Sequence, residues 1–376
     1  MNLDAAGTVW RVNQAAYAPT EVTRGYTSLD HIVEPEIRSI RHFLPDKSGV
    51  RKARRKLHAK AISIAAVFAV GYYLAVIGNR HPVLHIAGLV LVAHACVAAA
   101  TGIMHDANHS AFSKNKGLNK AAAIVADALG ASSWMWRFQH NLTHHRHTNV
   151  QTLDDDIEQM PFLRLTQEQP RRSYMRFQHI YAWVLYSFLT VKWLLVGDFM
   201  KIMKRESLAA GTSFKIQNHH RVAVVAGKLS HVAWALVLPL FFHGWASVLI
   251  VYAVCSASVG VVLATVFQLA HCVDRAEVMS LEHGLTGHRG FEHQVRTTVN
   301  IRWRNPVSRA WAWWLFGGLD RQIEHHLSPR SPHTSYKRLS SFVRAECDKR
   351  GLEYREHDGL FKALQSHYRH LRQMAL

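Results

Sequence analysis

The chain of 376 residues has four cysteines, at positions 96, 255, 272 and 347, and no Cys-x-x-Cys motif. This scarcity excludes a disulfide framework and a cysteine-based zinc module. Charged residues are also scarce at 19% of the chain, whereas 49% of residues are hydrophobic and several apolar runs approach or exceed 18 residues. Soluble domains seldom need runs of that length, so the composition favours a membrane protein.

The first 50 residues contain no long apolar stretch, so we expect no cleavable signal peptide. What the chain has in excess is positive charge and histidine. There are 45 Lys and Arg against 26 Asp and Glu, which gives a formal net charge of +19, and there are 27 histidines. A role in nucleic-acid binding is not expected, because the basic cluster at 51–60 directly precedes an apolar run and is typical of a topology signal.

Four apolar runs are expected to cross the membrane, at 61–78, 84–104, 222–242 and 246–270. Each reaches about 27 Å or more at 1.5 Å per residue. A further run at 180–197 contains Lys192 and is expected to lie along the membrane interface, as is an amphipathic stretch at 121–136. The expected fold class is therefore all-α: a polytopic bundle of about four transmembrane helices, with interfacial helices and a cytosolic, histidine-rich cap.

Basic residues precede the first expected span, follow the second and are abundant in the last 100 residues. The positive-inside rule therefore predicts that both termini and both large polar blocks are cytoplasmic. We expect a multi-pass protein of the plasma membrane with a cytosolic N-terminal segment at 1–60, a membrane domain at 61–355 and a cytosolic C-terminal tail at 356–376.

Three histidine clusters stand out: HDANH at 105–109, HNLTHH at 140–145 and QIEHH at 322–326. Residues four apart lie on the same face of a helix, and His271 ends the longest apolar run on the same expected side of the membrane. Neutral imidazole is the commonest metal ligand in proteins and suits iron, zinc, copper or nickel. The rings outnumber the ligands of one tetrahedral metal, so the pattern predicts two metals with open positions.

In order and separation, these clusters resemble the three histidine boxes of the integral-membrane fatty-acid desaturase family. The glutamine that begins the third cluster resembles the front-end and linoleoyl-CoA-desaturase-like branch. The similarity also includes FQLAH at 267–271, HQV at 293–295 and GGLD at 317–320, and it covers roughly residues 85–355. It implies an oxidoreductase that uses two non-haem irons, O₂ and two electrons to insert a double bond into a long-chain acyl-CoA or acyl-lipid.

The same resemblance implies a set of nine metal-site residues and no further catalytic side chain or organic cofactor site. Gln322 stands where relatives have histidine, and it would act on the metal directly or through a water molecule. Five nearby carboxylates, Asp106, Asp154, Asp155, Asp156 and Glu324, are expected either to hydrogen-bond the second nitrogen of ligand rings or to cap helices. The nine are His105, His109, His140, His144, His145, His271, Gln322, His325 and His326.

Many front-end desaturases contain a fused cytochrome b5 domain with a His-Pro-Gly-Gly motif, but this chain has only His81-Pro82-Val83, in an expected external turn. Electrons are therefore expected from a separate protein of ferredoxin or cytochrome b5 type and its reductase. The net positive charge would suit an acidic donor, anionic membrane lipids or the phosphates of an acyl-CoA equally well.

Three alternatives use the same features differently. A di-iron fatty-acyl hydroxylase or acetylenase would have the same histidine boxes, so only the product distinguishes it. A membrane zinc hydrolase would need fewer ligands and a general base such as that of an HExxH motif, which the sequence lacks. A metal transporter would need ionisable residues in mid-membrane, where only His94, Lys192 and Lys228 come close.

Overall fold

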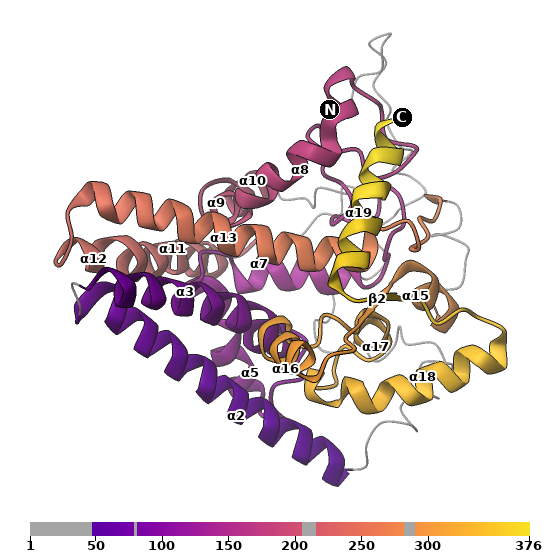
Figure 1. The fold of residues 1–376 in the computed structure, drawn as a ribbon, viewed down its shortest axis with the longest axis horizontal. Helices are drawn as coiled ribbons and strands as arrows, with labels where there is room; N and C mark the ends of the chain where they lie inside the picture. Colours follow the sequence, from indigo (N-terminus) through magenta and orange to yellow (C-terminus); the bar gives the residue numbers. More distant parts are fainter. Residues whose placement is uncertain (1–46, 79–80, 205–215, 282–289) are drawn as a thin grey trace.

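The computed structural model describes residues 47–78, 81–204, 216–281 and 290–376. These residues are mostly helical, and their one small sheet pairs β1 (Asn300–Arg302) with β2 (Glu356–Asp358) in parallel. Long helices lie side by side in one half of the molecule, and shorter elements gather at one end of them (Figure 1). The predicted all-α class is confirmed.

Four helices are long and apolar enough to cross a membrane, as predicted: Ser48–Ile77, Pro82–Asn108, Asn218–Leu240 and Trp245–His271. The fourth is the single α-helix α13 (Trp245–His271), whereas each of the others contains a π-helical turn. Their components are α2 (Lys47–Tyr72) with η4 (Tyr73–Ile77), α3 (Pro82–Ala99) with η5 (Ala100–Met104) and α4 (His105–Asn108), and α11 (Asn218–Val232) with η9 (Ala233–Val237) and α12 (Leu238–Leu240).

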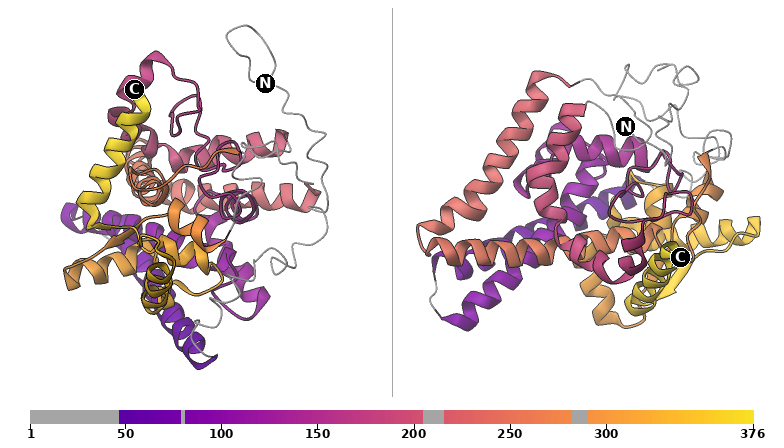
Figure 2. Two further views of the ribbon diagram at one scale, coloured as in Figure 1. Left: turned by 90° about the vertical axis from the view of Figure 1, so that its right-hand side faces the viewer. Right: turned by 90° about the horizontal axis from the view of Figure 1, so that it is seen from above.

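The four spans form two antiparallel pairs, so the end of the second and the end of the fourth lie at the same end of the bundle. At the opposite end the two connecting turns meet, because Nε2 of His243 lies 3.0 Å from the carbonyl oxygen of Val76 and the rings of His85 and His243 are 5.6 Å apart. His105 and His271 are consequently both at the end of the bundle away from these turns. Seen from above, the long helices extend away from the shorter elements (Figure 2).

The apolar run at 180–197 is not a straight span. Residues Ser173–Ser187 and Leu189–Met203 form two helical segments that are bent by 60° relative to each other. Their elements are η7 (Ser173–Phe177), α8 (Gln178–Ser187), α9 (Leu189–Lys192), η8 (Trp193–Gly197) and α10 (Asp198–Lys204). By length and composition the pair would suit either one broken span or a segment that does not cross.

Lys228 lies near the middle of the third span, and the structure gives it three partners. Its ammonium group is 2.5 Å from a carboxylate oxygen of Asp198 on α10, and it donates to the carbonyl oxygens of Gly130 and Trp193 at 2.6 and 2.8 Å. A charge in an apolar helix is costly unless it is paired and hydrogen-bonded. The span therefore tolerates this lysine, because Asp198 neutralises its charge and the two carbonyl oxygens accept its other hydrogen bonds.

The elements at the histidine end come from two stretches of chain. The first contributes α5 (Lys116–Ala123), α6 (Val125–Ala128), α7 (Ser133–Phe138) and the π-helical turn η6 (Gln139–His144). The second contributes α15 (Phe291–Thr297), α16 (Pro306–Phe316), α17 (Gln322–Leu327), η10 (His333–Ser335), α18 (Tyr336–Arg350) and α19 (Leu360–Ala375). Residues 356–376, expected to be a tail, form β2 and α19, and α19 packs against α8 and α13.

Gly317 lets the turn before the third cluster pack closely against the second span. Gly317 ends α16 with φ of +57°, and a Cβ atom at that position would lie 2.3 Å from the carbonyl oxygen of Thr101. Thr101 also donates from its hydroxyl to the carbonyl oxygen of Leu315 at 2.6 Å. Because only glycine allows backbones to approach this closely, the turn that leads into α17 rests directly on the helix that leads into His105.

Candidate metal centre

Eight histidine rings converge at the common end of the second and fourth spans, and we call them the histidine cage. They form overlapping groups in which the possible ligand atoms all lie within 4.8 Å of one another. One group is His105, His109, His140 and His325, another is His144, His271 and His326, and a third is His145, His325 and His326. These are the eight histidines that were expected from the sequence to lie in a metal site.

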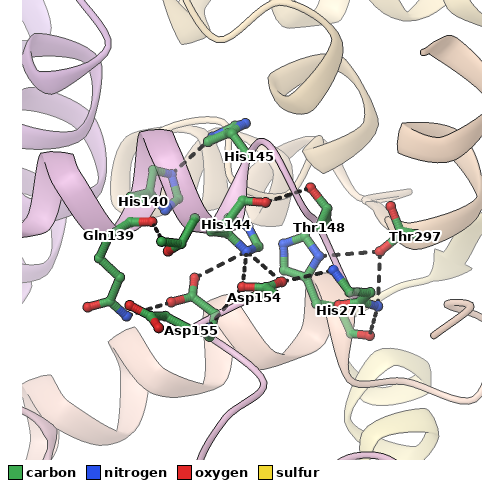
Figure 3. Close-up of polar contacts among 12 residues, drawn as sticks. Gln139, His140, His144, His145, Thr148, Asp154, Asp155, His271 and Thr297 are labelled. Atoms are coloured by element: carbon green, nitrogen blue, oxygen red, sulfur yellow. Dashed lines mark hydrogen bonds and ion pairs between the residues drawn. The ribbon is translucent and has the colours of Figure 1, made fainter. Parts of the chain in front are cut away.

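Two π-helical turns set the direction of these rings. The turn η5 immediately precedes His105, and the turn η6 contains His140 and His144. In η6 the amide of His145 donates to the carbonyl oxygen of His140, a spacing of five residues, and Nε2 of His145 lies 3.1 Å from Nε2 of His140 (Figure 3). Such turns are rare and occur mostly at functional sites. The sequence indicated only the spacing of four between His140 and His144.

The Nδ1 atoms of several rings are held from outside the cage, which leaves their Nε2 atoms directed inward. Nδ1 of His144 is 3.1 Å from both oxygens of Asp154, and Nδ1 of His271 is 3.3 Å from the carbonyl oxygen of Thr297 (Figure 3). Nδ1 of His325 is 3.0 Å from the Tyr336 hydroxyl. Hydrogen bonds of this kind fix the tautomer and orientation of a metal-binding histidine.

His326 is held by a small buried network. Its Nδ1 lies 2.9 Å from Oε1 of Gln294 and 3.1 Å from the hydroxyl of Thr148, and that hydroxyl also donates to Gln294. Nearby, Nε2 of His293 contacts the carbonyl oxygen of Thr148 at 2.9 Å. The network ties α15 to α17 and to the residues that follow the second cluster.

The five carboxylates that the sequence indicated divide into two kinds. Asp154 contacts His144 directly, Asp156 lies 3.4 Å from the same ring, and Asp106 lies 3.5 Å from Nδ1 of His105. Glu324 instead accepts hydrogen bonds from Asn300 and the hydroxyl of Tyr354, so it braces α17 from behind. Asp155 is fully buried, and its charge also raises the pKa of His144.

The electrostatics keep most of the cage rings neutral. Burial lowers the pKa of His109, His140, His145, His325 and His326 well below the ordinary value, and the neighbouring rings lower it further. A neutral ring has a free lone pair and can bind a metal. His144 is different: burial alone would lower its pKa, but the Asp154 and Asp156 carboxylates outweigh burial and raise the pKa to about 9.

Three buried atoms test whether the cage suits a metal. Nε2 of His109, Nε2 of His326 and Oε1 of Gln322 have no hydrogen-bond partner within the described part of the chain. Buried polar atoms are rarely left unpaired without a reason such as an ion. Gln322 lies one turn before His326 on α17 and is itself buried, so its amide oxygen belongs to the same unsatisfied set.

Sequence reasoning missed several residues that support the cage. Tyr336, Thr148 and His333 lie outside the three clusters, and nothing in their local sequence marks them. Trp136, at the end of the amphipathic stretch expected at the interface, stacks its indole ring on His140 at a centroid distance of 4.2 Å. It also packs on the apolar cluster that contains Cys96 and Leu263. The sequence signal for this contact is the spacing of four residues between Trp136 and His140, which places both side chains on one face of a helix.

A cavity of about 570 Å³ lies among the four spans. Its walls are mainly apolar and come from α2, α3, α11 and α13, with Val92, Cys96, Val259 and Leu263 nearest the histidine end. His85 and His243 line it near the far turns. The residues at its near end belong to the same apolar cluster as Trp136, which stacks on His140.

Comparison with known proteins agrees with this geometry. Residues 80–358 match the family described as "Fatty acid desaturase". The chain belongs to the fatty acid desaturase family. It is therefore a membrane-bound oxidoreductase that introduces double bonds into fatty acyl chains, a chemistry that in this family depends on iron. The resemblance seen in the three clusters is confirmed.

Several characterised desaturases are similar over most of this chain. A sn-1 linoleoyl-lipid 6-desaturase from Synechocystis sp. is 31% identical over 290 residues, which are 76% of this chain and 79% of that protein. A chloroplastic acyl-lipid (7-3)-desaturase from Chlamydomonas reinhardtii is 32% identical over 72% of this chain and 53% of its own length. An acyl-lipid (8-3)-desaturase from Physcomitrium patens is 30% identical over 84% and 66%. All three names place the relatives in the front-end and linoleoyl-lipid branch.

Proposed function

We propose that the histidine cage holds two irons. The observation that supports this most is that the rings form two separate ligand groups: His105, His109, His140 and His325 suit one iron, and His144, His271 and His326 suit the other. His145 lies between them, 3.1 Å from His140 and grouped with His325 and His326. Imidazole ligands suit iron, and neutral rings would leave such a centre more cationic than carboxylates would.

Gln322 completes the proposed set of nine. Its buried, unpartnered amide oxygen supports a contact with the iron near His326, made directly or through a water molecule. When bound, the two irons would supply the oxidising power with which O₂ removes hydrogen from an unactivated C–H bond, which no side-chain acid or base can do. The protein contributes orientation of the rings through Asp154, Gln294 and Tyr336, and a dry site.

The acyl chain would occupy the cavity among the spans. An apolar cavity of about 570 Å³ among the spans suits a flexible hydrocarbon chain and few other ligands. Trp136 would lie beside the chain where it passes the rings, since its indole stacks on His140 and belongs to the same apolar cluster as the residues at the near end of the cavity. The names of the relatives favour a lipid-linked acyl chain over an acyl-CoA.

We further propose that the cage faces the cytoplasm of a cell whose plasma membrane holds the protein. The positive-inside bias of residues 51–60 and of the C-terminal 100 residues supports this orientation, with residues 1–60 and 356–376 on the same side. Electrons would then arrive from a cytoplasmic donor of ferredoxin or cytochrome b5 type and its reductase. Positive surface charge favours an acidic donor.

The test is to purify the protein in detergent, measure its iron content and supply O₂, a reduced donor and lipids with defined acyl chains. We expect two irons per chain and a product that has lost two hydrogens, located by mass spectrometry. A product that has gained one oxygen would identify a hydroxylase on the same scaffold. Zinc in place of iron, or turnover without O₂, would contradict the proposal.

A further inference from the structure

A second pocket, also of about 570 Å³, lies on the outside of the third histidine cluster and is strongly basic. Six cationic side chains line it, from β1, α16, the turn before α17 and α18: Arg302, Arg304, Arg309, Arg321, Lys337 and Arg344. Glu356 is the one carboxylate among its lining residues. We call this the basic pocket. One carboxylate does not balance six cations, so the lining residues have a net positive charge.

The cations of the basic pocket fall into two classes. Arg302 and Arg344 pair with Glu356, Arg304 pairs with Asp358, and Arg321 donates to the Ser340 hydroxyl at 2.7 Å. These contacts fix the shape of the pocket. Arg309 and Lys337 are exposed, and within the described residues no hydrogen bond or ion pair engages either side chain. They are therefore available for an anion that comes from outside.

The position of α16 places the basic pocket at the depth of lipid headgroups. Ala312, Leu315 and Phe316 of this helix are buried against the second span near residues 92–104. Its other face exposes Val307, Trp311 and Trp313, whose exposed fractions are 77%, 41% and 38%. Tryptophan is typical of the membrane–water interface. Figure 1 shows α16 at the end of α3, with β2 and α18 beyond it.

We propose that the basic pocket binds the phosphate group of an anionic membrane lipid, with the lipid tails lying along the exposed face of α16. A concave pocket of this volume suits a headgroup better than the surface of a protein. Negatively charged leaflets attract basic residues at this depth. This inference goes beyond the proposed desaturase activity, because neither the cage nor the cavity is part of the site.

The bound headgroup would also contact residues that hold the third cluster in place. Asn300 lines the basic pocket and accepts from the amide of Ile323 at 3.0 Å, and it donates to Glu324 at 2.9 Å. Arg321, another lining residue, immediately precedes α17. Lipid binding would therefore brace the helix that carries His325 and His326 without touching either ring.

The experiment compares two double variants that lose the same charge. Arg309→Gln/Lys337→Gln removes the free cations of the basic pocket, and Lys116→Gln/Lys120→Gln removes two exposed lysines of α5 on the same face of the membrane. Iron-loaded protein in neutral detergent is titrated with dioctanoylphosphatidylglycerol, with dioctanoylphosphatidylcholine and with inorganic phosphate, and bound adducts are counted by native mass spectrometry. Iron content reports that each variant is folded.

We expect phosphatidylglycerol to bind the wild type and the α5 variant alike, and to bind the basic-pocket variant about thirty-fold more weakly, because each lost cation costs about 1 kcal/mol near an anionic group. If that variant loses iron, the single variant Lys337→Gln should still show a loss of several fold. Equal affinity in both double variants would overturn the proposal. So would displacement of the lipid by equimolar inorganic phosphate. Binding is measured without turnover, so its failure would leave the desaturase assignment intact.

Discussion

Nδ1 of His333 lies 2.9 Å from one carboxylate oxygen of Asp106, and the other oxygen of Asp106 is 3.5 Å from Nδ1 of His105. His333 in turn contacts the ammonium group of Lys60 through its Nε2 at 3.0 Å. All of these side chains are buried. A line of polar contacts thus runs from the first span through the C-terminal block to the first ring of the cage.

This line predicts the effect of Asp106→Asn. The substitution keeps the size of the side chain but removes the charge that orients His105, and such outer contacts typically contribute 10- to 100-fold to metal affinity. We expect iron to be lost to a chelator about that much more readily, as measured by metal analysis after timed exposure. Asp348→Asn, on the exposed face of α18, is the control. Unchanged iron retention in Asp106→Asn would show that His105 needs no such orientation.

His145→Ala and His326→Ala should each abolish turnover. Each removes a ring from the region where the ligand groups overlap, so we expect less than the full iron content in both variants, while insertion into the membrane continues. Fluorescence-detection chromatography and iron analysis would report folding and metal content separately. His219→Ala, in an exposed residue of α11, is the matched control. Retained activity in either cage variant would remove that residue from the ligand set.

Gln322 should tolerate histidine better than an apolar residue. The amide oxygen is buried and unpartnered, so Gln322→His supplies another donor atom and should keep part of the activity. Gln322→Leu has a similar size and no donor, and we expect it to lose iron and turnover. The ratio of iron per chain to activity in the two variants decides the matter. Full activity in Gln322→Leu would mean that this side chain contributes nothing to the metal site.

The ion pair between Lys228 and Asp198 should be strongly coupled in stability. Removing one partner leaves a buried charge, which typically costs about 3–5 kcal/mol. Lys228→Met and Asp198→Leu should therefore each lower the free energy of unfolding by about that amount. The double variant should lose less than the sum. Unfolding by sodium dodecyl sulfate, followed by intrinsic fluorescence, would give the coupling energy. Strict additivity would contradict a direct interaction.

Val251 lines the cavity on the part of α13 that lies toward the turns opposite the cage. Val251→Trp should block that end, because a larger side chain in a closed space excludes the terminal carbons of a long acyl chain. The products should shift to shorter chains, as measured by gas chromatography of the total fatty acids. Ile250→Trp is the control, since the Ile250 side chain is 64% exposed on the outer face of α13 and is not part of the cavity wall. An unchanged profile in Val251→Trp would place the acyl chain elsewhere.

Much of the fold could be predicted from the sequence because the bilayer imposes a simple rule on span length. The four apolar runs, the end at which His105 and His271 meet, and the convergence of the three clusters all followed from length, parity and spacing. The eight histidines that the structure brings together could be selected for a similar reason, since imidazole at helical spacing has few other purposes in such density.

Other features could not be predicted, because they depend on contacts between distant segments or on local hydrogen bonding. The π-helical turn at residues 139–144 pairs His140 with His145, and no local pattern distinguishes that turn from an α-helix. Lys228 interrupts the apolar run of the third span, and no sequence pattern indicates that Asp198, 30 residues earlier, pairs with it. His333 and Tyr336 support the cage from a segment whose sequence shows no metal-site pattern.

The eight rings of the cage come from residues 105–145 and 271–326, and each of the three all-histidine ligand groups draws on both stretches. During synthesis, the first five histidines therefore leave the ribosome long before their partners exist. The cage can be complete only after all four spans have been made and the turn at Gly317 has packed against Thr101. Assembly of the eight rings is thus a late event in the synthesis of this chain.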